Sequence, residues 1–123
     1  VVGEMGGIQT VMDIMKTSQN SDVLNTCLGL LANLINKCSE NKAVVAAIDG
    51  ERFLSRVLLR ATDPSLQLQC MHVINNMCVN APKGSKQKLR SHELAKKLKQ
   101  LSKSPDADLA QSAKTTLVNL LPS

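Results

Sequence analysis

Aromatic residues are almost absent from this sequence: among 123 residues there is one phenylalanine, Phe53, and no tryptophan or tyrosine. A core must therefore be built from leucine, valine, isoleucine, methionine and alanine, within a hydrophobic fraction of 43%. The same absence removes the stacking platforms with which many proteins hold single-stranded nucleic acid. Nucleic-acid binding is disfavoured on this ground, and no recognisable nucleic-acid-binding motif supports it.

The sequence also has no apolar run long enough to cross a membrane and no amino-terminal signal-peptide pattern. These absences predict a soluble, intracellular protein located in the cytoplasm or nucleus. The chain lacks an initiator methionine and opens inside a repeated unit, which indicates a fragment of a longer protein.

Motifs for catalysis and metal binding are missing as well. There is no glycine-rich phosphate loop, no GxSxG or HExxH sequence and no cysteine and histidine pairing typical of a nucleophilic site. The two histidines are isolated, and four cysteines follow helical periodicity rather than ligand spacing: Cys27, Cys38, Cys70 and Cys78. We therefore expect no enzymatic activity and no metal or other cofactor, with free thiols buried in a reducing compartment.

What the sequence does contain is a repeat. Asn33, Asn76 and Asn119 lie 43 residues apart at each step, with no gap required. Around Asn33, apolar residues at helical spacing predict a long helix over 23–35 that packs one face into a core. A period of this length is typical of helical solenoids, in which each unit stacks on the next. The predicted core stripe is Val23, Cys27, Leu30, Leu31 and Leu34; its counterparts are Leu66, Cys70, Ile74 and Met77, then Leu109, Ala113, Leu117 and Leu120.

Three stretches, GGIQTVMDIM, SDVLNTCLGLLANLIN and SENKAVVAAIDG, resemble the armadillo repeat. The resemblance covers essentially the whole chain and implies a right-handed, all-α, armadillo- or HEAT-like solenoid. Each unit would hold a short helix, a second helix and a longer third helix. We expect three units, over 1–38 with its first helix truncated, over 39–80, and over 81–123 as a basic carboxyl-terminal cap.

The local patterns predict where the helices begin and end. Glycine and proline at unit corners should stop them, and Arg52, Arg56 and Arg60 should share an outer face by their i+4 spacing. The first unit should keep an apolar face open at its amino-terminal side, stacking on the remainder of a longer parent chain. Helices are expected up to Gly7 and over 7–18, 23–38, 40–48, 51–61, 64–79, 86–90, 92–102 and 106–121.

The resemblance also implies a binding surface, because the third helices of armadillo proteins line a concave groove. An asparagine there offers a donor and an acceptor to the backbone of an extended peptide or partner protein. The alternative is that the asparagines only stabilise the stacking of the repeats. The predicted groove consists of Thr26, Gly29, Asn33, Asn36 and Lys37, of Gln69, His72, Asn76 and Asn80, and of Ser112, Thr115 and Asn119.

One departure from the family narrows the choice of ligand. Nuclear-import adaptors of this family pair the asparagine with a tryptophan one helical turn earlier, but here those positions hold Gly29, His72 and Thr115. Recognition of lysine-rich nuclear localisation signals is therefore disfavoured. His72 is either a groove residue that tunes binding near neutral pH or an ordinary surface histidine.

A second candidate surface is basic. Between residues 81 and 103 the chain has eight basic residues and one acidic residue, Glu93, whereas the rest has seven basic and nine acidic residues. This segment is either a solvated face or an electrostatic binding site for an acidic partner, nucleic acid or membrane, whose affinity would fall steeply with salt. Its basic residues are Lys83, Lys86, Lys88, Arg90, Lys96, Lys97, Lys99 and Lys103.

Together these patterns predict a non-catalytic protein-interaction module, a scaffold or adaptor that binds its partner on the concave third-helix face. Two alternatives remain: the basic third unit as the binding surface, or a purely structural segment of a larger adaptor or co-chaperone.

Overall fold

The computed structural model describes residues 2–36, 39–47, 49–78, 87, 89 and 91–120. Within these residues the chain forms seven α-helices and no strand, so the predicted all-α class is confirmed. The helices are α1 (Val2–Thr17), α2 (Ser21–Ile35), α3 (Ser39–Ala47), α4 (Gly50–Arg60), α5 (Pro64–Cys78), α7 (His92–Leu101) and α8 (Ala107–Leu120).

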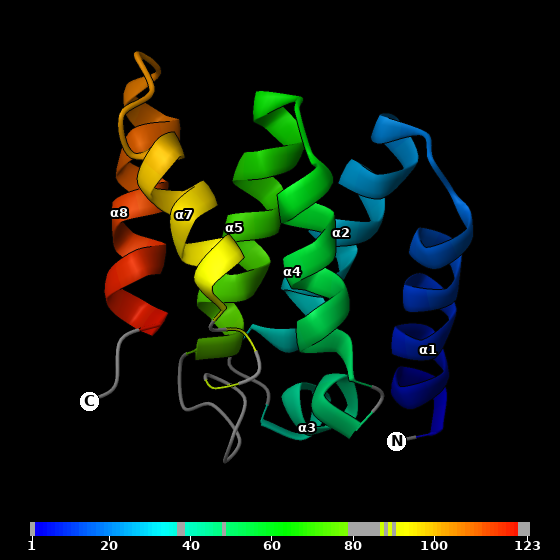
Figure 1. The fold of residues 1–123 in the computed structure, drawn as a ribbon. Helices are drawn as coiled ribbons and strands as arrows, with labels where there is room; N and C mark the ends of the chain where they lie inside the picture. Colours follow the sequence, from blue (N-terminus) through cyan, green and yellow to red (C-terminus); the bar gives the residue numbers. More distant parts are fainter. Residues whose placement is uncertain are drawn as a thin grey trace.

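The helices stack in two layers (Figure 1). Helices α1, α4 and α7 form one layer, helices α2, α5 and α8, which we call the long helices, form the other, and α3 lies across one end. The long helices begin at Ser21, Pro64 and Ala107, which are 43 residues apart. Since α2 packs on α5 and α5 on α8, the sequence period becomes a spatial stack, as expected for an armadillo-like solenoid.

Side-chain caps fix the start of several helices. The Asn20 side chain accepts hydrogen bonds from the backbone N–H groups of Asp22 and Val23 at 2.9 and 3.2 Å, and Ser91 Oγ accepts one from Leu94 N at 3.0 Å. These contacts satisfy amides that the first turn of a helix leaves without partners. Pro64, which lacks an N–H, occupies the first position of α5, where none is needed.

The corner between α3 and α4 depends on Asp49 and Gly50. Asp49 adopts a left-handed backbone conformation with φ of 58°, which ends the course of α3. A Cβ atom added to Gly50 would lie 2.5 Å from Val45 Cγ1, 2.9 Å from Val45 O and 3.3 Å from Met12 Cε. Gly50 therefore allows α3, α4 and α1 to approach more closely than any side chain would permit.

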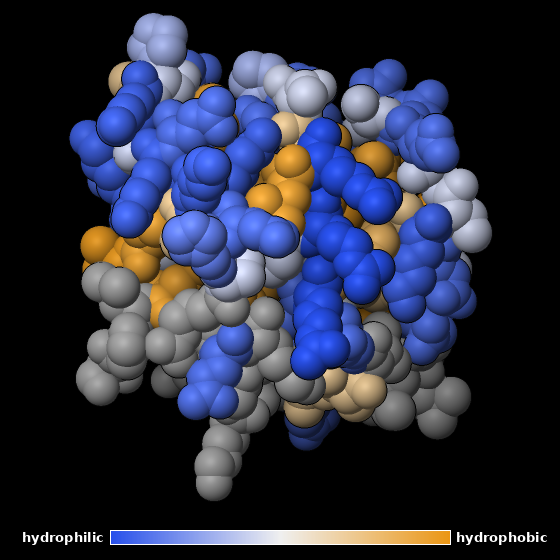
Figure 2. Space-filling model, in the orientation of Figure 1, coloured by the Kyte–Doolittle hydropathy of each residue, from blue (hydrophilic) through white to orange (hydrophobic). Residues whose placement is uncertain are grey.

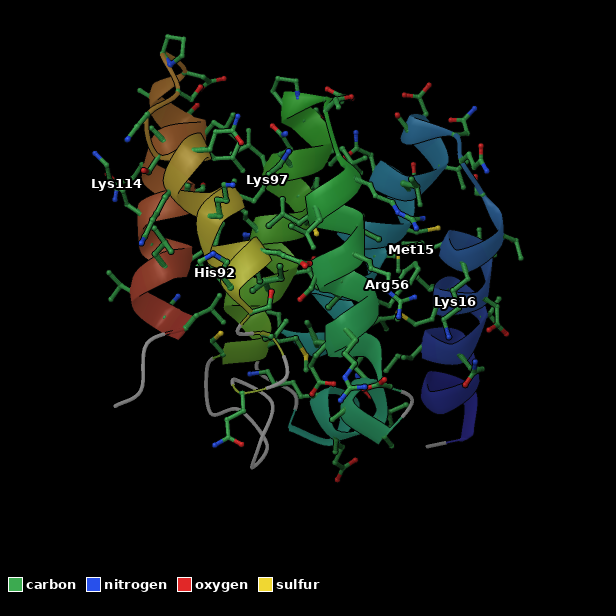
Figure 3. The ribbon with its side chains drawn as sticks, viewed as in Figure 1. Met15, Lys16, Arg56, His92, Lys97 and Lys114 are labelled. Carbon is green, nitrogen blue, oxygen red and sulfur yellow. The ribbon has the colours of Figure 1, made fainter. Side chains whose placement is uncertain are left out.

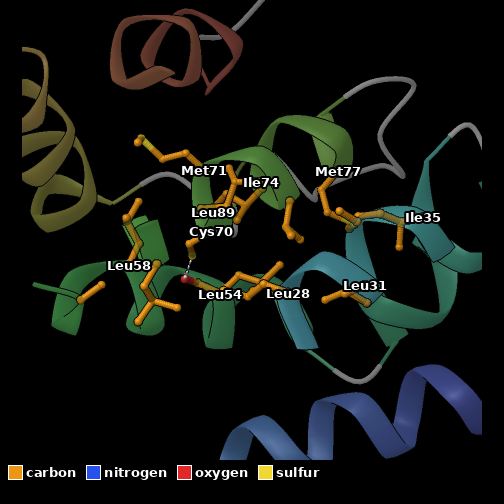
Figure 4. Close-up of a cluster of buried hydrophobic side chains, with 14 of the residues drawn as sticks. Leu28, Leu31, Ile35, Leu54, Leu58, Cys70, Met71, Ile74, Met77 and Leu89 are labelled. Carbon is orange, nitrogen blue, oxygen red and sulfur yellow. Dashed lines mark hydrogen bonds between the residues drawn. The ribbon is translucent and has the colours of Figure 1, made fainter. Parts of the chain in front are cut away.

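The core lies between the two layers and is aliphatic (Figure 4). Its largest buried apolar side chains are leucine, isoleucine and methionine, which fill the space left by the scarcity of aromatic residues. Cys70 is also buried and donates a hydrogen bond from Sγ to Leu54 O at 3.3 Å. Core residues from three helices meet here: Leu28, Leu31 and Ile35 of α2, Leu54 and Leu58 of α4, and Met71, Ile74 and Met77 of α5.

The predicted core stripe of α2 is wrong at two positions. Val23 and Leu30 are 37% and 50% exposed, because the buried face of α2 is centred on Cys27, Leu28 and Leu31. The equivalent positions one and two periods later are buried: Leu66 and Val73 in α5 are 5% and 0% exposed, and Leu109 and Thr116 in α8 are 4% and 0% exposed. The difference arises because α5 and α8 each have a preceding long helix on that side.

The predicted break at Gly7 is also wrong, because α1 continues from Val2 to Thr17 through Gly6 and Gly7. Glycine weakens a helix by about 1 kcal/mol without ending it. In the second unit the corresponding break is made by the left-handed backbone of Asp49. The unit boundaries predicted at residues 38 and 80, and most of the helix predicted over 86–90, lie outside the described residues.

Candidate functional site

Helices α2 and α5 form an open depression on the long-helix face, which we call the α2–α5 depression. Its volume is about 610 Å³. Five predicted groove residues meet here: Thr26, Gly29, Asn33, Gln69 and His72. Leu30, Ala32, Asn25 and Ser65 complete the lining.

Gly29 lines this depression and adds no side chain to it. A Cβ atom added at Gly29 would meet only Gln69 Nε2, at 3.9 Å, which is an ordinary van der Waals distance. The position is helical and its neighbours leave space above it. A larger side chain would therefore extend into the depression without displacing the backbone.

The three repeated asparagines have different environments. Asn33 is exposed beside the depression, whereas Asn76 and Asn119 are half-buried. Asn76 Nδ2 donates a hydrogen bond to Ala32 O of α2 at 3.4 Å, and Asn119 Nδ2 donates one to Asn75 Oδ1 of α5 at 2.9 Å. Both bonds join consecutive long helices, so these two residues contribute directly to the stacking of the repeats.

Asn25 and Ser65 belong to the depression but were missed by the sequence pattern. Asn25 Nδ2 donates a hydrogen bond to Ser65 Oγ at 3.2 Å, which links α2 to the first turn of α5. Asn25 Oδ1 is buried and has no hydrogen-bond partner in the structure. The residue one period after Asn25 is Leu68, so the repeat itself gives no signal for it.

Three other predicted groove residues, Asn36, Ser112 and Thr115, are not part of the depression's lining. Asn36 is exposed just after α2, and Thr115 is exposed on α8, where its hydroxyl oxygen accepts a hydrogen bond from Gln111 Nε2 at 3.4 Å. Ser112 is half-buried on α8, where its backbone oxygen accepts a hydrogen bond from Thr116 Oγ1 at 2.7 Å. Lys37 and Asn80 lie outside the described residues.

The basic third unit is described only in part. Lys83, Lys86, Lys88 and Arg90 lie outside the described residues, whereas Lys96, Lys99 and Lys103 are exposed on or just after α7. Lys97 (Figure 3) is half-buried, and its Nζ donates a hydrogen bond to Ala61 O at 3.2 Å. Ala61 caps the carboxyl end of α4, where a cation is favourable, so Lys97 stabilises the contact between α7 and α4.

The described cysteines are buried: Cys27, Cys70 and Cys78. Burial raises the pKa of the Cys70 thiol to about 12 and also raises the pKa of Cys27. In the part of the chain that the structure describes, no three histidine, cysteine, aspartate or glutamate side chains gather into a potential metal site. No described helix is both long enough and apolar enough to span a membrane.

The stacked helices, with a long helix every 43 residues, define an armadillo-like α-solenoid. Residues 4–103 match the family described as ELMO, armadillo-like helical domain, and the chain belongs to that family. A search of curated protein sequences gave no match.

Solved structures confirm the fold. Two engineered proteins from a structural genomics consortium superpose with TM-scores of 0.78 and 0.79 at 23% and 22% identity, each over 94% of this chain. A designed armadillo repeat protein superposes with a TM-score of 0.77 at 17% identity, also over 94%. The match spans 27%, 45% and 48% of those three proteins, respectively, so the chain is equivalent to less than half of each.

Proposed function

We propose that the protein is a non-catalytic interaction module that binds an extended peptide segment of a partner protein in the α2–α5 depression. Armadillo-like folds commonly mediate protein interactions and are typically non-catalytic. The observation that carries the proposal is the depression itself, where two consecutive long helices present polar side chains around the empty space above Gly29.

The side chains of the depression suit the backbone of an extended chain. Carboxamides such as Asn33 and Gln69 offer both a donor and an acceptor, so they pair with main-chain groups whatever the side chains of the ligand. Packed helices lie about 10 Å apart, which is the length of about three residues of extended chain. One contact for every three ligand residues is therefore geometrically reasonable.

Asn76 and Asn119 would act differently from Asn33. Each uses one amide hydrogen to bind the preceding long helix, and a carboxamide retains a second hydrogen and its carbonyl oxygen for a ligand. In this proposal they combine stacking with binding, and Asn33 contributes its whole side chain.

Blocking the depression tests the proposal. A library of random, extended peptides displayed on phage would be selected on the native protein, and each enriched peptide would then be measured against Gly29→Trp and Gly29→Ala. We expect enriched peptides to bind the native protein and Gly29→Ala equally and to lose at least about tenfold in affinity for Gly29→Trp, because the indole fills the depression. Circular dichroism would confirm that both variants keep the native helix content.

Two results would contradict the proposal. Peptides that bind Gly29→Trp as tightly as the native protein would place recognition elsewhere on the surface. A selection that enriches no peptide on the native protein would remove the extended-peptide function.

We further infer that the exposed edge of α2 stacks against an additional helical unit. Val23 and Leu30 are exposed, whereas their equivalents in α5 and α8 are covered by the preceding long helix. A unit in the same register would cover them in the same way, as in a longer solenoid. The test measures how much Leu30→Ala lowers the free energy of unfolding, both in this chain and in a protein with an armadillo unit fused ahead of Val1. The substitution should be strongly destabilising only if Leu30 is covered.

We place the protein in the cytoplasm or nucleus, because the buried thiols of Cys27 and Cys70, which form no disulfide, suit a reducing compartment. Protein partners are proposed in preference to nucleic acid, since the chain lacks the aromatic residues that stack on bases.

A further inference from the structure

A second groove lies in the opposite helix layer, between α1 and α4. Its volume is about 670 Å³, and we call it the arginine groove after Arg52, Arg56 and Arg60 of α4, which line it. Figure 2 shows this face of the molecule, with strongly hydrophilic side chains over α4 and apolar surface on both sides of them. Figure 3 labels Met15 and Lys16 on α1 and Arg56 on α4, on either side of the groove. We propose that the arginine groove binds an acidic, amphipathic helix of a partner protein.

The lining of the groove is apolar at several points. Met15 and Leu66 are almost completely buried, and Leu24, Phe53 and Val57 are partly buried and pack against the core. Lys16 lies with its Nζ 5.9 Å from the centre of the Phe53 ring, a cation–π arrangement that links α1 to α4. An apolar side chain entering from outside would find matching surface here.

The three arginines supply a regular row of positive charge. They are four residues apart on one helix, so successive side chains start about 6 Å from each other along α4. Arg52 Nε lies 3.7 Å from Asp49 Oδ1 in an exposed ion pair. Across the described residues, neither Arg56 nor Arg60 forms an ion pair, so two guanidinium groups are available to a ligand.

The spacing and chemistry of the row select the ligand. Guanidinium groups bind carboxylates through two parallel hydrogen bonds, and a helix with an acidic residue at every fourth position has the same repeat distance as the arginines. Apolar residues on the neighbouring edge of such a helix would contact the apolar lining, as in other helix-in-groove complexes. A flat membrane surface fits less well, because the apolar surface is recessed between two helices.

The next interface in the same layer provides a comparison. There Lys97 of α7 reaches across to Ala61 at the end of α4. Lys99 and Lys103 lie 43 residues after Arg56 and Arg60 and are exposed. These two lysines occupy the positions of the repeat equivalent to Arg56 and Arg60 and carry the same charge, but they lie on a different surface. Substituting them therefore provides a matched control for substituting the two arginines.

The experiment uses the complete chain and a short synthetic helical peptide. The peptide carries glutamates at every fourth position on one edge and leucines on the adjacent edge; a control peptide of the same composition has the glutamates distributed around the helix. Affinity is measured by fluorescence anisotropy for the native protein, for Arg56→Glu/Arg60→Glu and for Lys99→Glu/Lys103→Glu. Circular dichroism confirms that both variants, which change exposed side chains only, remain folded.

We expect the arginine variant to lose at least about tenfold in affinity and the lysine variant to change less than about twofold. A peptide with lysines in place of the glutamates should bind the arginine variant better than the native protein.

Two results would show only general charge attraction and would overturn the proposal. One is an equal loss of affinity in the two variants, and the other is equal affinity of the native protein for the two glutamate peptides. Preferential binding to vesicles of phosphatidylcholine and phosphatidylserine, lost in the same arginine variant, would overturn it in favour of a membrane surface. Since Gly29→Trp changes the opposite layer, it should leave this binding unchanged, so failure here is distinguishable from failure of the peptide site.

Discussion

Cys70 shows at the scale of one residue how the aliphatic core controls chemistry. Its thiol is completely buried and donates to Leu54 O, and burial raises its pKa to about 12. A thiolate is the reactive form of cysteine, so this side chain is unsuited to nucleophilic chemistry near neutral pH. Its position in the repeat therefore reflects packing.

The raised pKa predicts a pH-dependent contribution to stability. The thiol of the unfolded chain ionises near its ordinary pKa of about 9, whereas the folded form stays protonated up to about 12. The contribution is therefore complete below pH 9 and is lost as the pH rises from there through 12. We expect the stability difference between the native protein and Cys70→Ala to fall by roughly 1 kcal/mol between pH 8 and pH 10.

Urea unfolding at the two pH values measures this difference directly. Comparison with Cys70→Ala cancels the titration of lysines and of the other cysteines, which both proteins share. A difference that stays constant with pH would show that the Cys70 thiol ionises equally in the folded and unfolded states.

The asparagine repeat shows what sequence can and cannot predict about a residue. Its 43-residue spacing places Asn76 and Asn119 correctly at equivalent positions on the long helices. Their hydrogen-bond acceptors, Ala32 O and Asn75 Oδ1, lie on the preceding helix, 44 residues away in each case. A periodic pattern specifies which residues are equivalent, whereas the distance between units depends on how the helices stack.

At the scale of the helix, two glycines with opposite surroundings illustrate how helices α2 and α4 are placed. A Cβ atom added at Gly29 would make one ordinary van der Waals contact, with Gln69 Nε2 at 3.9 Å, whereas a Cβ atom added at Gly50 would lie only 2.9 Å from Val45 O. Gly29→Ala should raise the free energy of unfolding by about 0.5–1 kcal/mol, because alanine favours the helix. Gly50→Ala should lower it by about 1–3 kcal/mol, because backbone atoms of α3 must move.

Chemical unfolding of the two variants under one set of conditions tests this pair. The two substitutions are expected to change the free energy of unfolding in opposite directions, so an error common to both measurements could not produce this result. Destabilisation by Gly29→Ala, or an unchanged stability in Gly50→Ala, would contradict the packing described around these helices.

The start of α5 at residue 64 was predicted correctly, because a proline marks it and an apolar stripe follows. Helix α2 begins at Ser21, two residues before the predicted start at residue 23, because the Asn20 side chain caps it. The prediction was wrong at Gly7. We expected one helix to end and the next to begin there, as at Gly50 in the second unit, but α1 is continuous. That break depends on the left-handed backbone of Asp49, and Gly6 in the equivalent position continues the helix. Two similar sequences therefore form different local structures, and the choice is made by packing.

At the scale of the whole molecule, burial depends on whether a neighbouring unit is present. Leu30 and Val73 are equivalent in the repeat, yet Leu30 is 50% exposed and Val73 is 0% exposed. The sequence predicted Leu30 as core, because an apolar residue in a helical stripe carries no information about which neighbour covers it. The fold could thus be predicted from periodicity, but the exposed edge could not.

This difference gives a prediction for the stability of the solenoid. In the 123-residue chain, Leu30→Ala should change the free energy of unfolding by less than about 0.5 kcal/mol. Val73→Ala should cost roughly 2 kcal/mol, because it leaves a cavity between stacked helices. With one additional armadillo unit fused ahead of Val1, the cost of Leu30→Ala should rise to a similar value.

Thermal and urea unfolding of six proteins provide the measurements: the parent, Leu30→Ala and Val73→Ala, each with and without the fused unit, with Val73→Ala as the internal control in both backgrounds. If Leu30→Ala remained neutral in the fused protein, the edge of α2 would not be a stacking surface. A large cost in the unfused chain would instead indicate that another part of the chain covers it.

The hydrogen bonds of Asn76 and Asn119 also have a mechanical consequence. Each bond ties one long helix to the one before it, so any bending of the solenoid changes these two distances. The tie from α8 to α5 is 2.9 Å long, whereas the tie from α5 to α2 is 3.4 Å long and close to the limit for a hydrogen bond. The joint between α2 and α5 has a second tie, from Asn25 Nδ2 to Ser65 Oγ at 3.2 Å, so these two helices are joined both near their amino ends and near their carboxyl ends. A ligand that enters the α2–α5 depression would therefore meet two helices whose spacing is held near both ends.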